Sequence, residues 1–313
     1  MSFASFAGFI PGALNSTRSF LILGPTAVGK SDFAVAVAER CDGEIVSADA
    51  FQVYAGLDIL TAKPSSELQA RVPHHLIGEV PLGTPWDVAR WLDAARRRID
   101  EIHARGHRAI IVGGTGLYIR ALTRGLAELP PASPALRAEM ESHPLATLQR
   151  ELAELDPESA QRIDLQNPRR VIRALEVCLL TGRPFSSFRE QWSGTPSGWR
   201  GITLTRDRDE LYGRIDRRTV EMFESGVVNE IREAGEVGPS AQQAIGIREI
   251  RAHISGEMAQ AECTAAIQQT TRRYAKRQMT WFRRESEFRE ISLTGLASGS
   301  SLADEISCEA RAV

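Results

Sequence analysis

The segment Gly24-Pro-Thr-Ala-Val-Gly-Lys-Ser31 follows the apolar run from Phe20 to Leu23 and precedes a segment with helical periodicity. A strand, a glycine-rich loop and a helix in this order form a site whose backbone N–H groups converge on phosphate. The lysine adds a mobile positive charge, and the serine hydroxyl can complete a Mg²⁺ shell. The segment therefore predicts a diphosphate-binding loop without naming the reaction. Its residues are Gly24, Pro25, Thr26, Ala27, Val28, Gly29, Lys30 and Ser31, with Ser31 as the candidate Mg²⁺ ligand.

Strand and helix patterns alternate around this loop. Strands are predicted at 19–23, 44–46, 108–112 and 201–205, with a candidate last strand at 288–293. Helices are predicted at 30–40 and from about 85 to 105, the second capped by Thr84. Further helices run from the end of the strand at 201–205 to about residue 284. Alternation of this kind indicates a parallel sheet covered by helices. We therefore expect an α/β fold with a P-loop NTPase-like parallel sheet core flanked by helices.

The composition changes between about residue 125 and residue 199. Leu-Pro-Pro and Pro134 open a stretch of mostly helical pattern, and a Ser-Gly-Thr-Pro-Ser-Gly run closes it. We interpret this stretch as an inserted all-helical lobe. The expected organisation is a flexible extension at 1–17, a P-loop core at 18–128 and 200–293, the inserted helical lobe at 129–199 and a mobile tail at 294–313.

The overall composition bounds the class of protein. The chain has 313 residues, 42% of them hydrophobic, and a formal net charge of −2, but residues 272–289 are strongly basic, so nucleic acid remains a candidate partner. The four cysteines are scattered and fit reduced thiols. No apolar run reaches the roughly 18 residues that a membrane span needs, and no basic region precedes the apolar N-terminus. We expect a soluble, cytoplasmic, monomeric protein.

A carboxylate follows the second predicted strand. Asp49 lies in Ser-Ala-Asp-Ala-Phe-Gln, on the same sheet edge as the phosphate loop, and is a candidate general base. Aspartate also suits the N-cap of a helix. A metal-holding acid is less favoured, because the usual Walker B aspartate ends a longer apolar strand. The base and the cap both stay open at this point.

The strand at 108–112 is the natural position for a Walker B acid, yet it ends in Gly113-Gly-Thr115-Gly. An ordinary ATPase or GTPase would carry an acid there. Thr115 instead offers a hydroxyl at the sheet edge, and the glycines allow close approach of the backbone. The alternative is a tight turn from strand to helix without a chemical role.

Three basic segments complete the pattern. Arg169, Arg170 and Arg173 lie in the first turns of a helix and suit a phosphodiester backbone. Arg214 and Arg218 are four residues apart on one helix face, where two guanidinium groups could clamp a leaving phosphate. For both helices the alternative is a solvated face with surface ion pairs. In the segment 271–283, Arg alternates with Tyr and Trp, which is typical of a nucleic-acid surface, but the aromatic face could equally be core.

Six segments taken together resemble the tRNA dimethylallyltransferase family, also called tRNA isopentenyltransferase. They are GPTAVGKS at 24–31, SADAFQVYAGLDILTAKP at 47–64, PHHL at 73–76, VGGTGLYIRAL at 112–122, NPRRVIRALEV at 167–177 and AKRQMTWFR at 275–283. Their order is that of the family, and their joint specificity far exceeds that of any one motif.

The resemblance implies transfer of a dimethylallyl group from dimethylallyl diphosphate to N6 of adenosine 37, in tRNAs that read codons starting with U, with Mg²⁺ as cofactor. It assigns Asp49 as the general base and Thr115 and Arg218 as further catalytic residues, and it adds Arg214 to the diphosphate site. The implied tRNA contacts are Asp49, Ala50, Phe51, Gln52, Thr115, Arg137, Arg169, Arg170, Val171, Ile172, Arg173, Gln243, Ala244, Ile245, Gly246, Ile247 and Arg248.

Three residues depart from the family pattern. Ala50 stands where Ser is usual, which removes a hydroxyl that could bind the substrate or orient Asp49. Leu60 replaces a usual Gly, and Ile247 replaces a usual Tyr. None of the three is a residue that the resemblance assigns to bond making.

Two other functions compete with this interpretation. The phosphate loop alone is also typical of a P-loop kinase of a small metabolite or nucleoside, which would bind and consume ATP. The basic segments alone are compatible with an RNA-binding protein that has a degenerate nucleotide site, although the intact Lys30 and Ser31 count against it.

Overall fold

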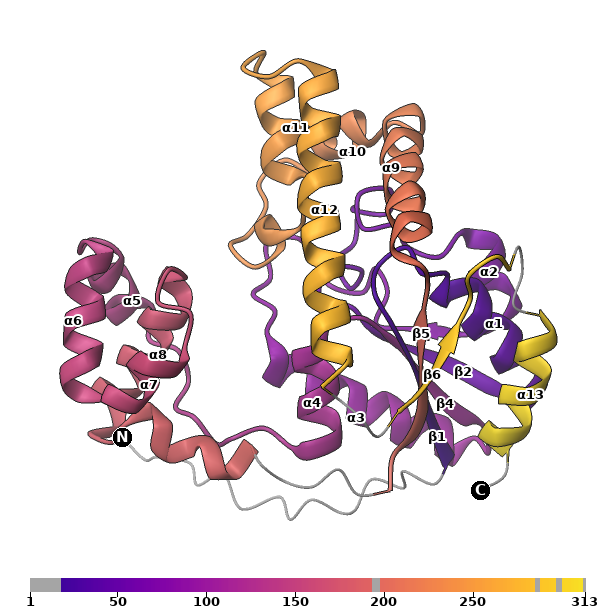
Figure 1. Cartoon of the computed structure of the whole chain (residues 1–313), viewed down its shortest axis with the longest axis horizontal. Coiled ribbons are helices and arrows are strands. Elements are labelled where there is room, and N and C mark those ends of the chain that lie inside the picture. The colour runs from indigo at the N-terminus through magenta and orange to yellow at the C-terminus, as the bar shows by residue number, and fades with distance from the viewer. Residues whose placement is uncertain (1–17, 193–197, 285–287, 297–299, 312–313) are drawn as a thin grey trace. The chain divides into compact units, whose positions relative to one another are not determined.

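The computed structural model describes residues 18–192, 198–284, 288–296 and 300–311. The extension expected at 1–17 lies outside these residues. The chain divides into two compact units, Met1–Ile119 with Gly198–Val313 and Arg120–Ser197 (Figure 1). The second unit is thus an insertion into the first, at nearly the place where the composition of the sequence changes.

The larger unit is built on a six-stranded sheet. Its strands are β1 (Ser19–Leu23), β2 (Gly43–Ala48), β3 (His74–His75), β4 (Arg108–Gly113), β5 (Arg200–Thr205) and β6 (Arg289–Ser292). Their order is β3-β2-β4-β1-β5-β6, and all neighbouring pairs are parallel, which confirms the predicted fold class. Because β1 lies between β4 and β5, the loop that follows it emerges at the middle of the sheet edge.

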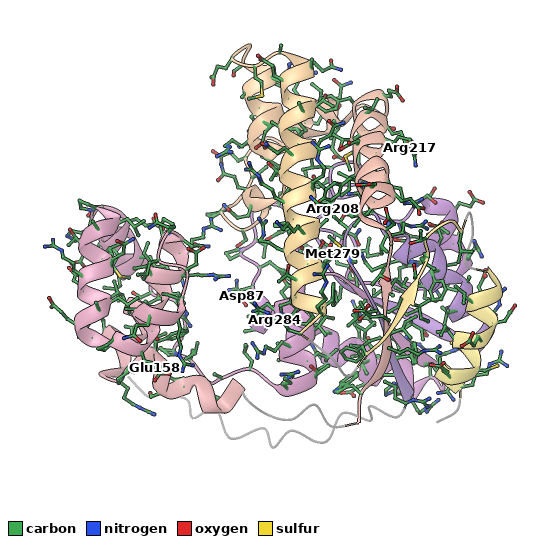
Figure 2. All side chains as sticks on the ribbon, viewed as in Figure 1. Asp87, Glu158, Arg208, Arg217, Met279 and Arg284 are labelled. Atoms are coloured by element: carbon green, nitrogen blue, oxygen red, sulfur yellow. The ribbon has the colours of Figure 1, made fainter. Side chains whose placement is uncertain are left out.

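Helices after β5 form a second part of this unit. They are α9 (Arg208–Glu224), α10 (Val227–Glu233), the short turn η3 (Ala241–Gln243), α11 (Ile247–Ile254) and α12 (Gln260–Phe282). α9 and α12 pack side by side and α11 packs on α12 (Figure 1). Arg208 and Arg217 extend from α9, and Met279 lies on α12 (Figure 2).

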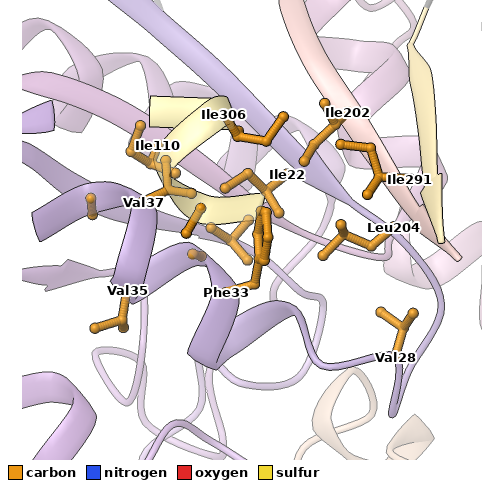
Figure 3. Close-up of a cluster of buried hydrophobic side chains, with 14 of the residues drawn as sticks. Ile22, Val28, Phe33, Val35, Val37, Ile110, Ile202, Leu204, Ile291 and Ile306 are labelled. Carbon is orange, nitrogen blue, oxygen red and sulfur yellow. The ribbon is translucent and has the colours of Figure 1, made fainter. Parts of the chain in front are cut away.

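Both faces of the sheet are buried. Phe20 and Ile22 of β1 share a hydrophobic cluster with Phe33 of α1 (Lys30–Cys41) and Ile306 of α13 (Ser300–Arg311) (Figure 3). Leu21, which points to the opposite face, is also fully buried. Side chains alternate along a strand, so burial at successive positions means that both faces are covered, as in open α/β sheets.

The remaining helices of the larger unit are α2 (Ser66–Arg71), α3 (Val88–Ala104) and the start of α4 (Gly116–Arg124). The prediction that Thr84 caps α3 was wrong. Asp87 is the cap, and its Oδ1 accepts from the N–H groups of Ala89 and Arg90, both at 3.0 Å. A carboxylate directly before the first turn satisfies two orphan donors that Thr84 is too far away to reach.

The structure also differs from the mobile tail expected from residue 294. Residues 300–311 form α13, which packs against α1. Ala303, Ile306 and Ala310 are buried at helical spacing, and Asp304 pairs with Arg40 of α1. The apolar stripe of this short helix covers α1, which a polar-looking terminal sequence did not reveal.

The smaller unit is all-helical, with α5 (Pro134–Glu141), α6 (Leu145–Leu155), α7 (Pro157–Arg162), α8 (Pro168–Thr181) and the turn η2 (Phe185–Trp192). Met140, Leu148, Leu152, Val171 and Leu175 form its main cluster of buried side chains. Within the described residues of the whole chain, no helix is long and apolar enough to cross a membrane.

Candidate active site

The loop after β1 lines a cavity. Thr26, Ala27, Gly29, Lys30 and Ser31 face a space of about 410 Å³ at the carboxyl edge of the sheet. The Lys30 ammonium donates to the carbonyl of Pro25 at 2.8 Å. Because the loop ends at the N-terminus of α1, its N–H groups and this ammonium make the cavity attractive to an anion. The three other predicted loop residues, Gly24, Pro25 and Val28, are buried and shape the loop from behind.

Arginines hold the loop from outside. Arg214 Nε donates to the Ala27 carbonyl at 2.8 Å, and Arg218 Nη2 donates to Thr26 Oγ1 at 2.8 Å. Both arginines line the cavity. The alternative of a solvated basic face is therefore wrong for this pair, although their exposed neighbour Arg217 lies at the rim of the same cavity.

Gln278 joins two active-site loops and was missed at the sequence level. Its Oε1 accepts from the Thr26 N–H, and its Nε2 donates to the Gly114 carbonyl, both at 2.9 Å. The side chain is only 6% exposed. A Cβ at position 114 would lie 2.3 Å from Gln278 Nε2, so the bridge requires glycine there. The only available signal was the motif AKRQ, which does not reveal which loops the glutamine joins.

Asp49 follows β2 and faces two cavities. Its Oδ1 accepts from the N–H groups of Phe51 and Gln52 at 2.9 and 3.2 Å, which closes a turn; the alternative of a helix N-cap is wrong, because the segment after Asp49 forms turns and the next helix is α2. Among the described residues its other oxygen has no hydrogen-bond partner, and the residue lines both cavities. One carboxylate oxygen thus orients the side chain, while the other remains available to accept a proton.

Thr115 lies beside Asp49. Its hydroxyl accepts from the Ala50 N–H at 3.2 Å, so the two sheet-edge loops are tied together at this point. The glycine-rich run after β4 is both a tight turn and part of the site. Tyr274 of α12 is nearby. Burial raises the pKa of its phenol, and the Asp49 carboxylate adds to the rise.

A second, smaller cavity adjoins the first. Its volume is about 70 Å³, and it shares Thr26, Asp49, Thr61 and Arg218 with the larger cavity. Its other walls are mostly apolar, formed by Phe51, Leu60, Met222, Ala244, Ile245 and Ile267, with Thr219, Thr271 and Tyr274. The polar groups therefore stand between a cationic space and an apolar one.

Burial lowers the pKa values of two cationic groups in the larger cavity. Burial lowers the pKa of the Lys30 ammonium to about 8, with Asp49 opposing the shift and Arg218 adding to it. Burial likewise lowers the pKa of the Arg218 guanidinium, against the attraction of Asp49. Several cations are thus held close together without enough acid to neutralise them, as expected of a site that receives a polyanion.

The predicted arginines of the smaller unit are of two kinds: some are exposed, and others form an internal ion pair. Arg169 and Arg170 are exposed in the first turn of α8. Arg137 donates to both oxygens of the fully buried Glu176 carboxylate at 3.0 Å, and Arg173 binds the same carboxylate. Arg137 and Arg173 are therefore fixed by an internal ion pair as well as being partly exposed.

Some predicted tRNA-contact side chains lie in the core. Val171, Ile172 and Ile247 are buried, because they occupy apolar helix positions that pack inward. A contact there would need the main chain. In the same segment as Ile247, Gln243 and Arg248 are exposed. The aromatic residues of 271–283 are partly core as well, since Tyr274 and Trp281 are each only half-exposed.

The residues of the cationic cavity fit a Mg²⁺ ion that is bound partly by the protein and partly by the phosphates of a substrate. The described residues contain no cluster of three or more His, Cys, Asp or Glu that could hold a metal by themselves. Mg²⁺ commonly binds through few protein oxygens, several waters and the phosphates of a substrate. The Ser31 hydroxyl, which lines the cavity beside Lys30, is suited to that arrangement.

Two family models match the chain. The IPP transferase model matches residues 52–285, and the isopentenyl transferase model matches residues 17–78. The first alone covers well over half of the chain and includes Gln278 and helix α9, which carries Arg214 and Arg218.

Individual proteins of this kind are similar over nearly their whole length. A tRNA dimethylallyltransferase of Geobacter sulfurreducens is 45% identical over 281 residues, covering 87% of this chain and 90% of that protein. One from a Caulobacter species is 44% identical over 282 residues, with 86% and 91% covered. The crystal structure of the tRNA isopentenylpyrophosphate transferase of Bacillus halodurans superimposes with a TM-score of 0.67 at 36% identity, covering 93% of this chain and 94% of that one.

Proposed function

The chain belongs to the IPP transferase family, and on this premise we propose that it transfers a dimethylallyl group from dimethylallyl diphosphate to tRNA. The acceptor is N6 of adenosine 37 in tRNAs that read codons starting with U. The products are N6-(dimethylallyl)adenosine and diphosphate. The names of the relatives support this activity.

One observation carries the proposal: Thr26, Asp49, Thr61 and Arg218 line both the cationic and the apolar cavity. A diphosphate in the first and a five-carbon group in the second would place the bond between them at these four residues. No acid follows β4 to serve a nucleoside triphosphatase, since that strand ends at Gly113 and is followed by Gly114 and Thr115. This arrangement favours transfer of the carbon group over the kinase reaction.

The step divides between two sides of the site. The amine of adenine is a weak nucleophile, because its lone pair is delocalised into the ring. As N6 bonds to C1 of the allyl group, the C1–O bond to diphosphate breaks, and the N6 proton passes to the free oxygen of Asp49. The Arg218 guanidinium and Lys30 ammonium stabilise the negative charge that develops on the leaving diphosphate.

Mg²⁺ is part of the proposal, with the Ser31 hydroxyl as its protein ligand. Bound there, the ion would neutralise diphosphate charge. For the acceptor, the adenine must leave its stacked position in the anticodon loop to reach Asp49. Exposed Arg169 and Arg170 of the smaller unit are suited to the phosphate backbone of the same RNA. Cytoplasmic location and a monomeric state remain predictions from the sequence.

The test uses purified protein, Mg²⁺, dimethylallyl diphosphate and a tRNA anticodon stem-loop with adenosine at position 37. The expected product is heavier by one dimethylallyl group, located by nuclease digestion and mass spectrometry. Asp49→Asn should abolish transfer and leave diphosphate binding largely intact. A protein that consumes ATP and never adds mass to the RNA would refute the proposal.

A further inference from the structure

Arg206 is a charged residue whose side chain is almost completely buried. It follows β5 directly, and only 5% of its side chain is exposed. It is not one of the residues that line the cationic cavity. Burying a charge costs free energy unless the charge is paired and hydrogen-bonded. One of the partners that hold Arg206 is the phosphate loop, since its Nε donates to the Val28 carbonyl at 3.1 Å.

This hydrogen bond fixes the peptide group between Val28 and Gly29. The described residues contain no cis peptide bond, and in a planar trans peptide the carbonyl of one residue and the N–H of the next point in opposite directions. Because the Val28 carbonyl is directed at Arg206, the Gly29 N–H points away from Arg206. Gly29 lines the cavity, and its N–H has no hydrogen-bond partner within the part of the chain that the structure describes. It is therefore available to a phosphate oxygen.

The orientation of this peptide group depends on a contact from outside the loop. Gly29 has a φ of 106°, and glycine moves freely through this region, so it does not by itself fix the peptide group that precedes it. The Val28 side chain packs in a hydrophobic cluster (Figure 3), but that contact does not orient its carbonyl. Among the described residues, Arg206 is the one hydrogen-bond donor to the carbonyl.

The Arg206 guanidinium is itself held in place. Its Nη1 pairs with the Glu210 carboxylate in the first turn of α9. The same carboxylate accepts from the Gly295 N–H at 3.1 Å, in the segment after β6. Hydrogen bonds between charged groups are strong and directional. Neither Glu210 nor Gly295 lines the cavity, so the support of the Val28 carbonyl lies entirely outside the space that receives the anion.

We infer that Arg206 is a positioning residue of the donor site, which holds the Val28 carbonyl so that the Gly29 N–H is directed at the diphosphate. The inference rests on the proposed function, which makes a diphosphate the group that the loop binds. Arg206 acts through the peptide group and touches neither the donor nor the reacting atoms.

The test measures binding of inorganic diphosphate to the full-length protein by isothermal titration calorimetry in the presence of Mg²⁺. Arg206→Met removes every donor of the side chain and should raise the Kd at least about tenfold, because hydrogen bonds to charged groups are among the stronger ones. Arg206→Gln loses the same charge, but its amide nitrogen is as many bonds from Cα as the Nε of arginine and can donate to Val28. It should bind diphosphate at least about threefold more tightly than Arg206→Met.

Arg208→Met is the matched control. Arg208 lies two residues further along and is exposed (Figure 2), and its guanidinium lies over the Tyr212 ring, 5.2 Å from the centroid. Its loss removes a cation from the same segment without a contact to the phosphate loop, so the Kd should stay within about twofold of wild type. A Kd for folded Arg206→Met within about twofold of wild type would overturn the inference. Equal Kd values for Arg206→Met and Arg206→Gln would overturn it too, because the effect would then belong to the charge alone.

If Arg206→Met does not fold, the double variant Arg206→Met with Glu210→Gln takes its place, since it leaves no unpaired carboxylate, and the same increase in Kd is expected. In the transfer assay the KM for dimethylallyl diphosphate should rise with the Kd, and the KM for the stem-loop should stay unchanged. A wild-type protein that binds diphosphate but never transfers the allyl group would refute the proposed function. The comparison of Kd values would still decide the role of Arg206.

Discussion

Gln278 and Thr26 are 252 positions apart in the chain and are joined by a hydrogen bond of 2.9 Å from the Thr26 N–H to Gln278 Oε1. The other end of the same amide donates to the Gly114 carbonyl. Thr26 also accepts from Arg218 through its hydroxyl. The bridge therefore sets the relative position of the phosphate loop, the turn after β4 and the arginine proposed to bind the leaving group.

Replacing this amide should impair catalysis more than binding of RNA. Gln278→Leu leaves a buried N–H and a buried carbonyl without partners, each costing roughly 1–3 kcal/mol. We expect kcat to fall by about 10- to 100-fold, since that cost falls on the geometry of reacting groups. KM for the stem-loop should change little. Gln278→Glu keeps the acceptor for Thr26 but loses the donor to Gly114, and its kcat should lie between those of wild type and Gln278→Leu. A kcat within twofold of wild type for folded Gln278→Leu would contradict this role.

Use of the donor should weaken at alkaline pH. The Lys30 ammonium is charged below its pKa of about 8 and neutral above it, so its attraction for diphosphate is lost as the pH rises through that value. KM for dimethylallyl diphosphate should therefore increase between pH 7 and pH 9.5. Lys30→Met should show a high KM that does not change over this range. A flat profile for wild type would show that Lys30 does not contribute to donor binding.

Arg218 should matter through its hydrogen bonds as well as its charge. Arg218→Lys keeps a cation but loses the planar group that reaches Thr26 Oγ1. Removal of one preorganised donor to developing charge typically costs about 10²- to 10³-fold in kcat, and we expect a loss of about 100-fold. Single-turnover kinetics would measure the chemical step directly. The exposed neighbour provides the comparison, since Arg217→Lys should change the same rate by less than about threefold.

The smaller unit should depend on its buried carboxylate. Burial alone would raise the pKa of Glu176, but hydrogen bonds from Arg137 and Arg173 outweigh it and hold the pKa below the ordinary value. Glu176→Ala leaves two arginines without their partner, and breaking a buried pair in this way costs about 3–5 kcal/mol. Thermal denaturation should show the loss in Glu176→Ala.

Acid should have a related effect on the same unit. Because the pKa of Glu176 is lower in the folded state, its contribution to stability is complete above the unfolded value of 4.5 and declines as the pH falls through the folded value. The difference in the free energy of unfolding between wild type and Glu176→Gln should therefore shrink as the pH is lowered from 6. A difference that does not change with pH would show that the carboxylate has no such role.

Local sequence signals were enough to predict the sheet and the position of the candidate site residues at its edge. The phosphate loop, Asp49 and Thr115 each follow a strand directly, and parallel strands bring their carboxyl ends to one edge. The resemblance to a known family added the assignments of Arg214 and Arg218. These residues needed only their own segment to be recognised.

Long-range partners could not be predicted in this way. Gln278 accepts from the Thr26 N–H, Glu230 accepts from the Ile59 N–H and Arg206 Nε donates to the Val28 carbonyl, each across more than 170 positions. Nothing in the local pattern shows which N–H or carbonyl each side chain contacts. The burial of Val171 and Ile247, in contrast, has a local cause. They lie in segments rich in polar residues, but helical periodicity turns their side chains into the core.

The Gln278 bridge also has a consequence for folding during synthesis. The phosphate loop is translated before the residue that joins it to the turn after β4, because Gln278 follows Thr26 by 252 positions. Domains fold as units while ribosomes add roughly 5–20 residues per second. A ribosome-bound fragment that ends before residue 278 therefore lacks the amide that joins the phosphate loop to the turn after β4, so these two loops are held together only once that residue has been added.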